Sequence, residues 1–219
     1  MASIRQGRCA YLLAALLALL AIYPYLQDLV TGRVALGVLN VAILITAIAS
    51  TDRSRLSLST AGALGAVVIV LLGWHLAHPG RLAYIVLGIA MALYYVFVIG
   101  DLLVYVLRRG SVTADKLFAA VSAYLLIGLL WAVLLTLLYE LAPAAFLAVG
   151  PAAKPAPLDF YDFLPVSFGT LTTAGFSGIV PAIHHARSLL MLEQITGVLY
   201  VAVLIARLTG IYQPDPPRS

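Results

Sequence analysis

Long apolar stretches separated by short polar segments dominate the sequence. A helix that rises about 1.5 Å per residue needs about 20 residues to cross about 30 Å of hydrocarbon. The stretches of about this length cover approximately residues 9–29, 33–50, 60–78, 82–107, 117–141 and 188–209. They are too long and too uniformly apolar for the alternating strands of a membrane barrel. The pattern therefore predicts an all-α integral membrane protein with about six transmembrane helices.

One polar interruption differs from the other connecting segments. It covers residues 170–181, Thr-Leu-Thr-Thr-Ala-Gly-Phe-Ser-Gly-Ile-Val-Pro, between the last two apolar stretches. Non-helical backbone at bilayer depth is tolerated only where protein covers it or where it lines a water-filled cavity. Upstream, Asp162 can cap a short helix over residues 163–171 with Pro165 in its first turn. We therefore expect a re-entrant pore helix and a selectivity-filter loop before the last span.

The stretch from Thr172 to Pro181 resembles the signature of the tetrameric potassium channel superfamily, Thr-Thr-Val-Gly-Tyr-Gly-Asp followed closely by Pro. The resemblance covers roughly residues 117–210, in the order helix, pore helix, filter, proline, helix. It implies a homotetramer in which the backbone carbonyls of each filter replace the hydration shell of a permeant cation. The ion-coordinating residues that it implies are Thr172, Thr173, Ala174, Gly175, Phe176 and Ser177.

The glycines of this loop have a separate physical reason. Stacking consecutive carbonyls on one side requires residues at positive φ, and Gly175 adopts this conformation without penalty. Ser177 stands where the family has a second glycine, and Gly178 where it has an aspartate that braces the filter. Gly178 is expected to absorb part of the strain and so to support the filter. These departures leave two alternatives open: a potassium channel or a weakly selective monovalent cation channel.

Two residues of the last apolar stretch are candidates for supporting roles. A lone carboxylate in a membrane span must pair or become protonated, so Glu193 is expected to brace the pore helix or filter of a neighbouring subunit. An ordinary structural hydrogen bond is the equal alternative. Gly197 lies where the inner helix of such channels could have a hinge.

Composition and charge support a membrane protein and suggest its orientation. Hydrophobic residues make up 63% of the 219 residues and charged residues 10%, with a net charge of +4. With six spans and a cytoplasmic N-terminus, the inner side receives nine of the 13 basic residues. This bias predicts a multi-pass protein of the cell membrane with both termini in the cytoplasm. The lipid bilayer is the expected environment, and no nucleic-acid partner is expected.

The chain divides near the basic linker at residues 108–116. We predict a four-span N-terminal membrane domain over residues 1–110, a pore domain over 111–212 and a short cytoplasmic tail over 213–219. A voltage sensor needs several arginines in its fourth span, but residues 82–106 contain no Lys or Arg. Conventional voltage gating is therefore not expected. The first four spans are predicted to form a scaffold, with gating by the filter, by lipid or by an unidentified regulatory partner.

Other function classes remain as alternatives or are disfavoured. A nonconducting scaffold or regulatory subunit with a degenerate pore loop is the alternative from a different class. The sequence has no Ser/His/Asp grouping, no paired carboxylates on one helix face and no phosphate-binding loop, so we expect no enzyme activity. His75 and His78 are one helical turn apart, but interfacial anchoring beside Trp74 explains them better than a metal site. No cofactor is expected beyond the permeant cation, potassium or another monovalent ion.

Overall fold

The structure is a computed structural model that describes residues 8–26, 39–43, 45–47, 55–108, 113–149, 157–175 and 178–210. The helices are α1 (Arg8–Leu26), α3 (Arg55–Ala77), α4 (Arg81–Leu107), α5 (Ala114–Leu141), the short 3₁₀ turn η2 (Pro143–Ala145), α6 (Phe160–Leu171) and α7 (His184–Gly210). Among the described residues, the helices long and apolar enough to cross a membrane are α1, α3, α4, α5 and α7. These helices coincide with five of the predicted spans, and the mostly helical structure is consistent with the predicted all-α membrane protein.

The remaining predicted span, residues 33–50, lies largely outside the described residues. Within it, residues 39–43 and 45–47 are helical. Ile43 and Ala47 are fully buried there. The predicted domain boundary at residue 110 and the predicted tail at 213–219 also lie outside the described residues.

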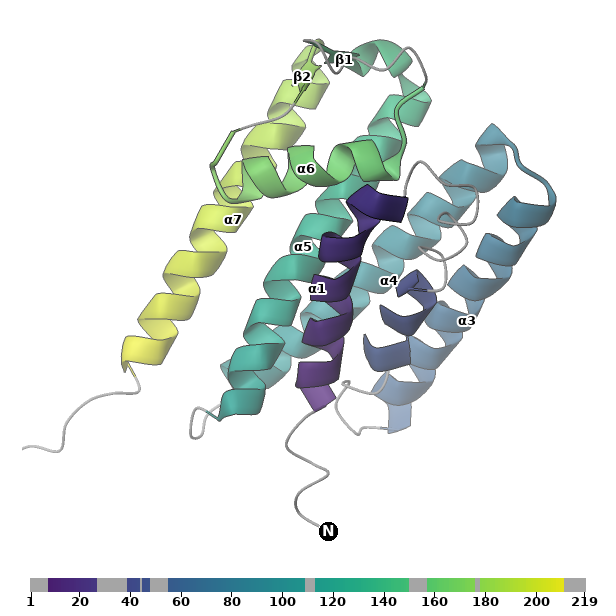
Figure 1. Cartoon of the computed structure of the whole chain (residues 1–219). Coiled ribbons are helices and arrows are strands. Elements are labelled where there is room, and N and C mark those ends of the chain that lie inside the picture. Colours follow the sequence, from purple (N-terminus) through teal and green to yellow (C-terminus); the bar gives the residue numbers. More distant parts are fainter. Residues whose placement is uncertain are drawn as a thin grey trace, which may run out of the picture.

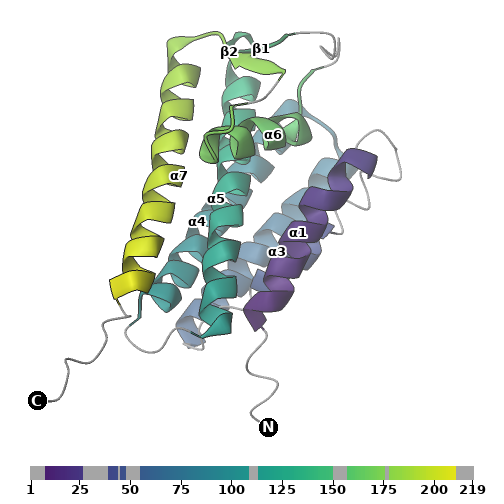
Figure 2. The same ribbon diagram turned by 60° about the vertical axis from the view of Figure 1, so that its left-hand side comes forward.

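The long helices form one bundle with α5 at its centre. α5 packs against α1, α4, α6 and α7, while α3 packs against α4. Figures 1 and 2 show α6 lying across the bundle, nearer to the end opposite the start of α1 and the finish of α7. The short helix therefore joins α5 to α7 without running parallel to either.

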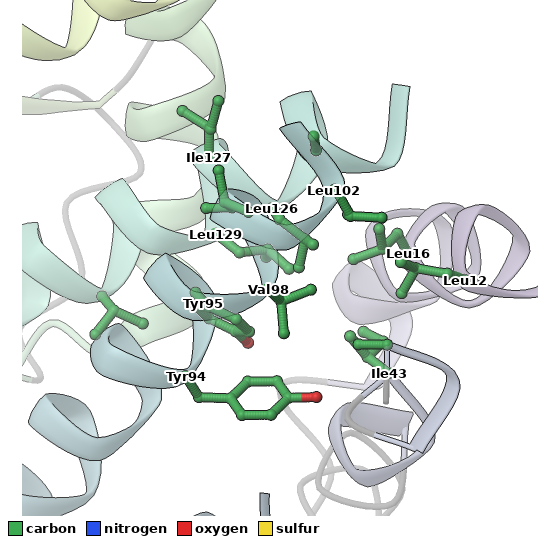
Figure 3. Close-up of a cluster of buried hydrophobic side chains, with 14 of the residues drawn as sticks. Leu12, Leu16, Ile43, Tyr94, Tyr95, Val98, Leu102, Leu126, Ile127 and Leu129 are labelled. Atoms are coloured by element: carbon green, nitrogen blue, oxygen red, sulfur yellow. The ribbon is translucent and has the colours of Figure 1, made fainter. Parts of the chain in front are cut away.

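Most of the core lies between α1, α4 and α5. Figure 3 shows Tyr94, Tyr95 and Val98 of α4 facing the side chains of neighbouring helices, among them Leu126 of α5. Lipid tails are as apolar as leucine, so close packing of side chains, rather than their removal from water, holds helices together in a membrane. A second cluster surrounds Phe163 of α6. The centroid of its ring lies 5.0 Å from the ring centroid of Phe146.

A small β ladder is a feature that the all-helical prediction missed. β1 (Phe146–Ala148) pairs antiparallel with β2 (Ile179–Pro181), with Leu147 opposite Val180. Short strands of three residues give no clear alternation in the sequence, so hydropathy alone does not identify them. The ladder joins the segment after α5 to the segment that follows the loop after α6, and it therefore holds the two ends of the α6 region together.

Candidate pore helix and loop

The start of α6 is fixed by a capping box that differs from the prediction. Asp159, not Asp162, is the N-cap, and its carboxylate accepts hydrogen bonds from the N–H groups of Tyr161 and Asp162 at 2.8 and 3.2 Å. Asp162 completes the box as the third helical residue by accepting from the Asp159 N–H at 3.0 Å. This reciprocal arrangement satisfies orphan N–H groups at a helix start. The predicted helix therefore begins three residues too late, and Pro165 lies beyond its first turn.

The same turn of α6 carries a tyrosine that stays neutral. Burial, followed by the nearby charge of Asp159, raises the pKa of Tyr161 to about 12. An ordinary phenol, with a pKa near 10, is already protonated at neutral pH, and this shift moves its ionisation further from that range.

The finish of α6 leads directly into the predicted filter. The N–H of Thr172 donates to Phe168 O and that of Thr173 to Thr170 O, both at 3.0 Å, and Gly175 N–H reaches back to Gly169 O at 3.0 Å. This resembles the Schellman ending of a helix, in which the residue after the C-cap takes a left-handed conformation. Here that residue is Thr173, with φ of 60°. The helix end itself thus shapes the first residues of the loop.

Two of the described residues of the loop have positive φ. Gly175 has φ of 70°, as predicted, whereas the same region at Thr173 was not predicted. A left-handed conformation costs a residue with a Cβ about 1 to 2 kcal/mol. Strain of this kind persists only where the surrounding hydrogen bonds enforce it, and it occurs often at functional sites.

The predicted filter residues that the structure describes are exposed. Thr172, Thr173, Ala174 and Gly175 are all exposed. The Thr172 hydroxyl bonds back to Phe168 O at 2.6 Å. Phe176 and Ser177 lie outside the described residues. The described residues of the chain therefore leave a large part of each of these four loop residues uncovered.

Gly178 follows the loop at the edge of the β ladder. Its carbonyl accepts a hydrogen bond from Val149 N–H at 2.7 Å, which extends the pairing of β1 and β2 by one residue. A Cβ at this position would lie 3.4 Å from Val149 O. The structure thus ties the residue predicted to support the filter to the segment after α5.

Gly128 of α5 allows α6 to pack closely against α5. A Cβ at Gly128 would lie 2.6 Å from the ring of Phe168, so only glycine leaves room for this ring. The Gly128 carbonyl also accepts a hydrogen bond from the Ser167 hydroxyl at 2.8 Å. Small residues allow this close approach of helices in membrane proteins.

Glu193 of α7 is completely buried against the same serine. Its exposed fraction is 0%, and its Oε1 is hydrogen-bonded to the Ser167 hydroxyl. A hydroxyl has a single hydrogen, and the Gly128 carbonyl can only accept. Both contacts of Ser167 are satisfied together when Glu193 is a neutral carboxylic acid that donates to the hydroxyl. Glu193 therefore makes a structural hydrogen bond to α6 of its own chain, which is one of the two alternatives that the sequence left open.

Gly197 lies against the end of α6. A Cβ there would lie 2.1 Å from the carbonyl oxygen of Leu171. The sequence predicted a hinge at this glycine. The structure shows a different need for glycine here, because the backbones of α6 and α7 approach each other too closely for a side chain. The Leu171 oxygen also accepts a hydrogen bond from the Tyr124 hydroxyl of α5 at 3.3 Å.

Several contact residues escaped the sequence analysis. Gly128, Ser167 and Tyr124 lie in uniformly apolar or short helical segments, where one glycine or hydroxyl gives no distinctive pattern. The presence of both a glycine and a tyrosine in a membrane helix was the available signal. Within the described residues, no group of three or more His, Cys, Asp or Glu side chains could hold a metal ion.

Comparison with known proteins finds a family similarity, and it lies in this region. Residues 123–213 match a protein-family model described as an ion channel. No curated protein matches the chain, and no solved structure matches it. The matched range begins within α5 and includes α6, the loop and α7. Over these residues the chain is similar to ion channels, and this similarity supports membership of the ion channel superfamily.

Proposed function

We propose that the protein is a passive cation channel in which four copies place the loops after α6 around a common axis. The depth of the loop carries this proposal. Leu171, the last residue of α6, contacts Gly197, which is the fourteenth of the 27 residues of α7. Gly128, which contacts α6, is the fifteenth of the 28 residues of α5. If α5 and α7 cross the membrane, residues 172–175 begin near its middle.

Exposed backbone at this depth needs water or protein around it. An unsatisfied peptide group in hydrocarbon costs several kcal/mol, so a loop with exposed residues from Thr172 to Gly175 is not stable against lipid. A water-filled path shared between copies removes this cost and leaves the carbonyls free to bind a dehydrated cation. The negative end of the α6 dipole lies at Leu171 and favours a cation there.

Potassium is the proposed permeant ion, with residues Thr172 to Ser177 as the filter and Gly178 and Glu193 as its support. Gly197 serves as a close-packing position and is retained as the proposed hinge. The charge bias of the sequence favours a cell-membrane protein with both termini in the cytoplasm. A re-entrant path of α6 and the loop is part of the same proposal.

Ion flux from vesicles tests this function. The purified protein is reconstituted into potassium-loaded liposomes, and potassium efflux is measured, followed by the same assay with sodium. A potassium channel releases potassium much faster than sodium, and a weakly selective channel releases both. Protein-free vesicles are the control. Flux no faster than this control would overturn the channel proposal in favour of a nonconducting scaffold.

A further inference from the structure

The first turn of α6 has one backbone group that its own cap does not satisfy. The first four N–H groups of a helix have no acceptor inside it. In α6 these belong to residues 159–162, and the capping box provides acceptors for Asp159, Tyr161 and Asp162. The remaining group is the N–H of Phe160. Its acceptor must come from elsewhere in the molecule.

Tyr84 of α4 provides this acceptor. The Phe160 N–H donates to the Tyr84 hydroxyl at 3.3 Å, across 76 residues of sequence. The Tyr84 ring is itself packed against His75 of α3, with ring centroids 5.3 Å apart. A helix of the N-terminal unit (the helices up to α4) therefore completes the cap of the pore helix.

A second contact reaches the same turn from α1. The rings of Tyr23 and Tyr161 are stacked, with centroids 6.4 Å apart and planes inclined by 14°. Stacked aromatic pairs stabilise a contact beyond the area that they bury. Two helices of the N-terminal unit thus hold neighbouring residues of one helical turn.

The other end of α6 contacts α5 and α7. Leu171 O accepts from Tyr124 of α5 at 3.3 Å and lies against Gly197 of α7. α6 has 12 residues, which corresponds to a length of about 18 Å. A shift at its first turn therefore moves the end from which the loop at Thr172 begins.

We propose that the N-terminal helices control ion conduction through the first turn of α6, with Tyr84 as the positioning residue. This inference rests on the proposed channel function. Tyr84 touches no ion. It fixes the tilt of α6, and the tilt fixes where the left-handed residues Thr173 and Gly175 present their carbonyls. Tyr23 acts on the same turn through its ring.

The test is a hydroxyl deletion read out in planar bilayers. Tyr84→Phe removes the acceptor and keeps the ring against His75. We expect a reversal-potential shift equal to a threefold to tenfold change in the potassium-to-sodium permeability ratio, roughly the effect of one lost hydrogen bond, or a similar change in the open fraction of single channels. Neither quantity depends on how many molecules are folded.

Tyr105→Phe is the matched control. Tyr105 lies in the same helix, about 30 Å further along it, and its hydroxyl donates to Asp115 Oδ2 at 3.0 Å. This variant also loses one hydrogen bond, but it should keep the parent's reversal potential and open fraction. Tyr23→Leu tests the same turn independently and should shift them in the same direction as Tyr84→Phe.

The outcomes separate the two proposals. A parent protein that passes no cation overturns the channel function and this inference with it. A conducting parent whose Tyr84→Phe and Tyr23→Leu variants retain its reversal potential and open fraction overturns only the inference. A shift in the Tyr105→Phe control as large as that in Tyr84→Phe also contradicts it, because the effect would then not be specific to α6.

Discussion

α5 and α7 are alike in sequence character but differ in their surroundings. They have 28 and 27 residues and are both apolar enough to cross a membrane. In the most apolar stretch of each helix, 56% of the α5 residues are buried but only 11% of the α7 residues. The large apolar side chains that α7 exposes are Met191, Leu192, Ile195, Val198, Leu199, Val201, Val203 and Ile205. Helices that are both long and apolar enough to cross a membrane therefore differ in how much of their surface their own chain covers.

Each of the two helices packs against α6 through one glycine, and the two glycines face different groups of α6. Gly197 of α7 faces backbone, the Leu171 carbonyl, whereas Gly128 of α5 faces the ring of Phe168. A ring can turn or shift, but the backbone at a helix end moves only with the helix. The contact with the poorly buried helix is thus predicted to be the less tolerant of change.

Replacement of Gly197 should have the largest effect. In Gly197→Ala, the new Cβ would lie 2.1 Å from Leu171 O, which forces α6 and α7 apart. We expect a loss of about 3 kcal/mol or more, at the upper end of overpacking effects. The measurement is unfolding in detergent by heat or denaturant. Gly73→Ala is the control, since a Cβ at Gly73 meets nothing within 4 Å. Equal stability of Gly197→Ala and the parent would contradict this contact.

Gly128→Ala should cost less, about 1 to 3 kcal/mol, because the Phe168 ring can move. Phe168→Leu makes space and should recover part of the loss in the double variant. A double-mutant cycle measures this coupling. Strict additivity of the two changes would show that Gly128 and Phe168 do not share the space that the structure gives them.

Substitutions of Glu193 test whether its contact with Ser167 needs a neutral or a charged carboxyl group. Glu193→Gln keeps a neutral group that can donate to the Ser167 hydroxyl, and it should change stability by less than about 1 kcal/mol. Glu193→Leu leaves Ser167 without this partner and should cost about 1 to 3 kcal/mol. Thermal unfolding of both variants measures the difference. A glutamine variant as unstable as the leucine variant would mean that the negative charge is needed.

Thr173→Gly should have the smallest effect on stability. Glycine removes the strain at φ of 60° but adds freedom to the unfolded chain, so we expect a net gain of about 1 kcal/mol or less. Ala174→Gly is the control, because Ala174 is a neighbouring exposed residue whose φ is not positive, and this change should not stabilise the protein. Destabilisation by Thr173→Gly would indicate that the threonine side chain contributes more than its conformation costs.

The sequence predicted those features that follow from length and from residue chemistry. Apolar runs of membrane length identified α1, α3, α4, α5 and α7, and glycine's tolerance of positive φ identified Gly175. The N-cap was misplaced by three residues because Asp159 and Asp162 form one box, and either acid alone is a plausible cap. A threonine at positive φ runs against its preference and could not be expected.

Contacts between residues far apart in the chain could not be predicted from a single sequence. Nothing near Tyr84 indicates that its hydroxyl meets the N–H of Phe160, because the partner lies 76 residues away. The low burial of α7 was equally hidden, since its hydropathy matches that of better buried helices. Pairings of this kind depend on how the helices assemble, and residue type alone does not determine them.

The number of chains in the native complex tests the central claim most directly. We propose that other copies surround the exposed loop at Thr172 to Gly175 and part of the exposed face of α7. The measurement is the mass of the complex extracted in native lipid, determined by native mass spectrometry. The account predicts four times the 23.3 kDa of one chain. A single chain as the only species in native lipid would contradict it.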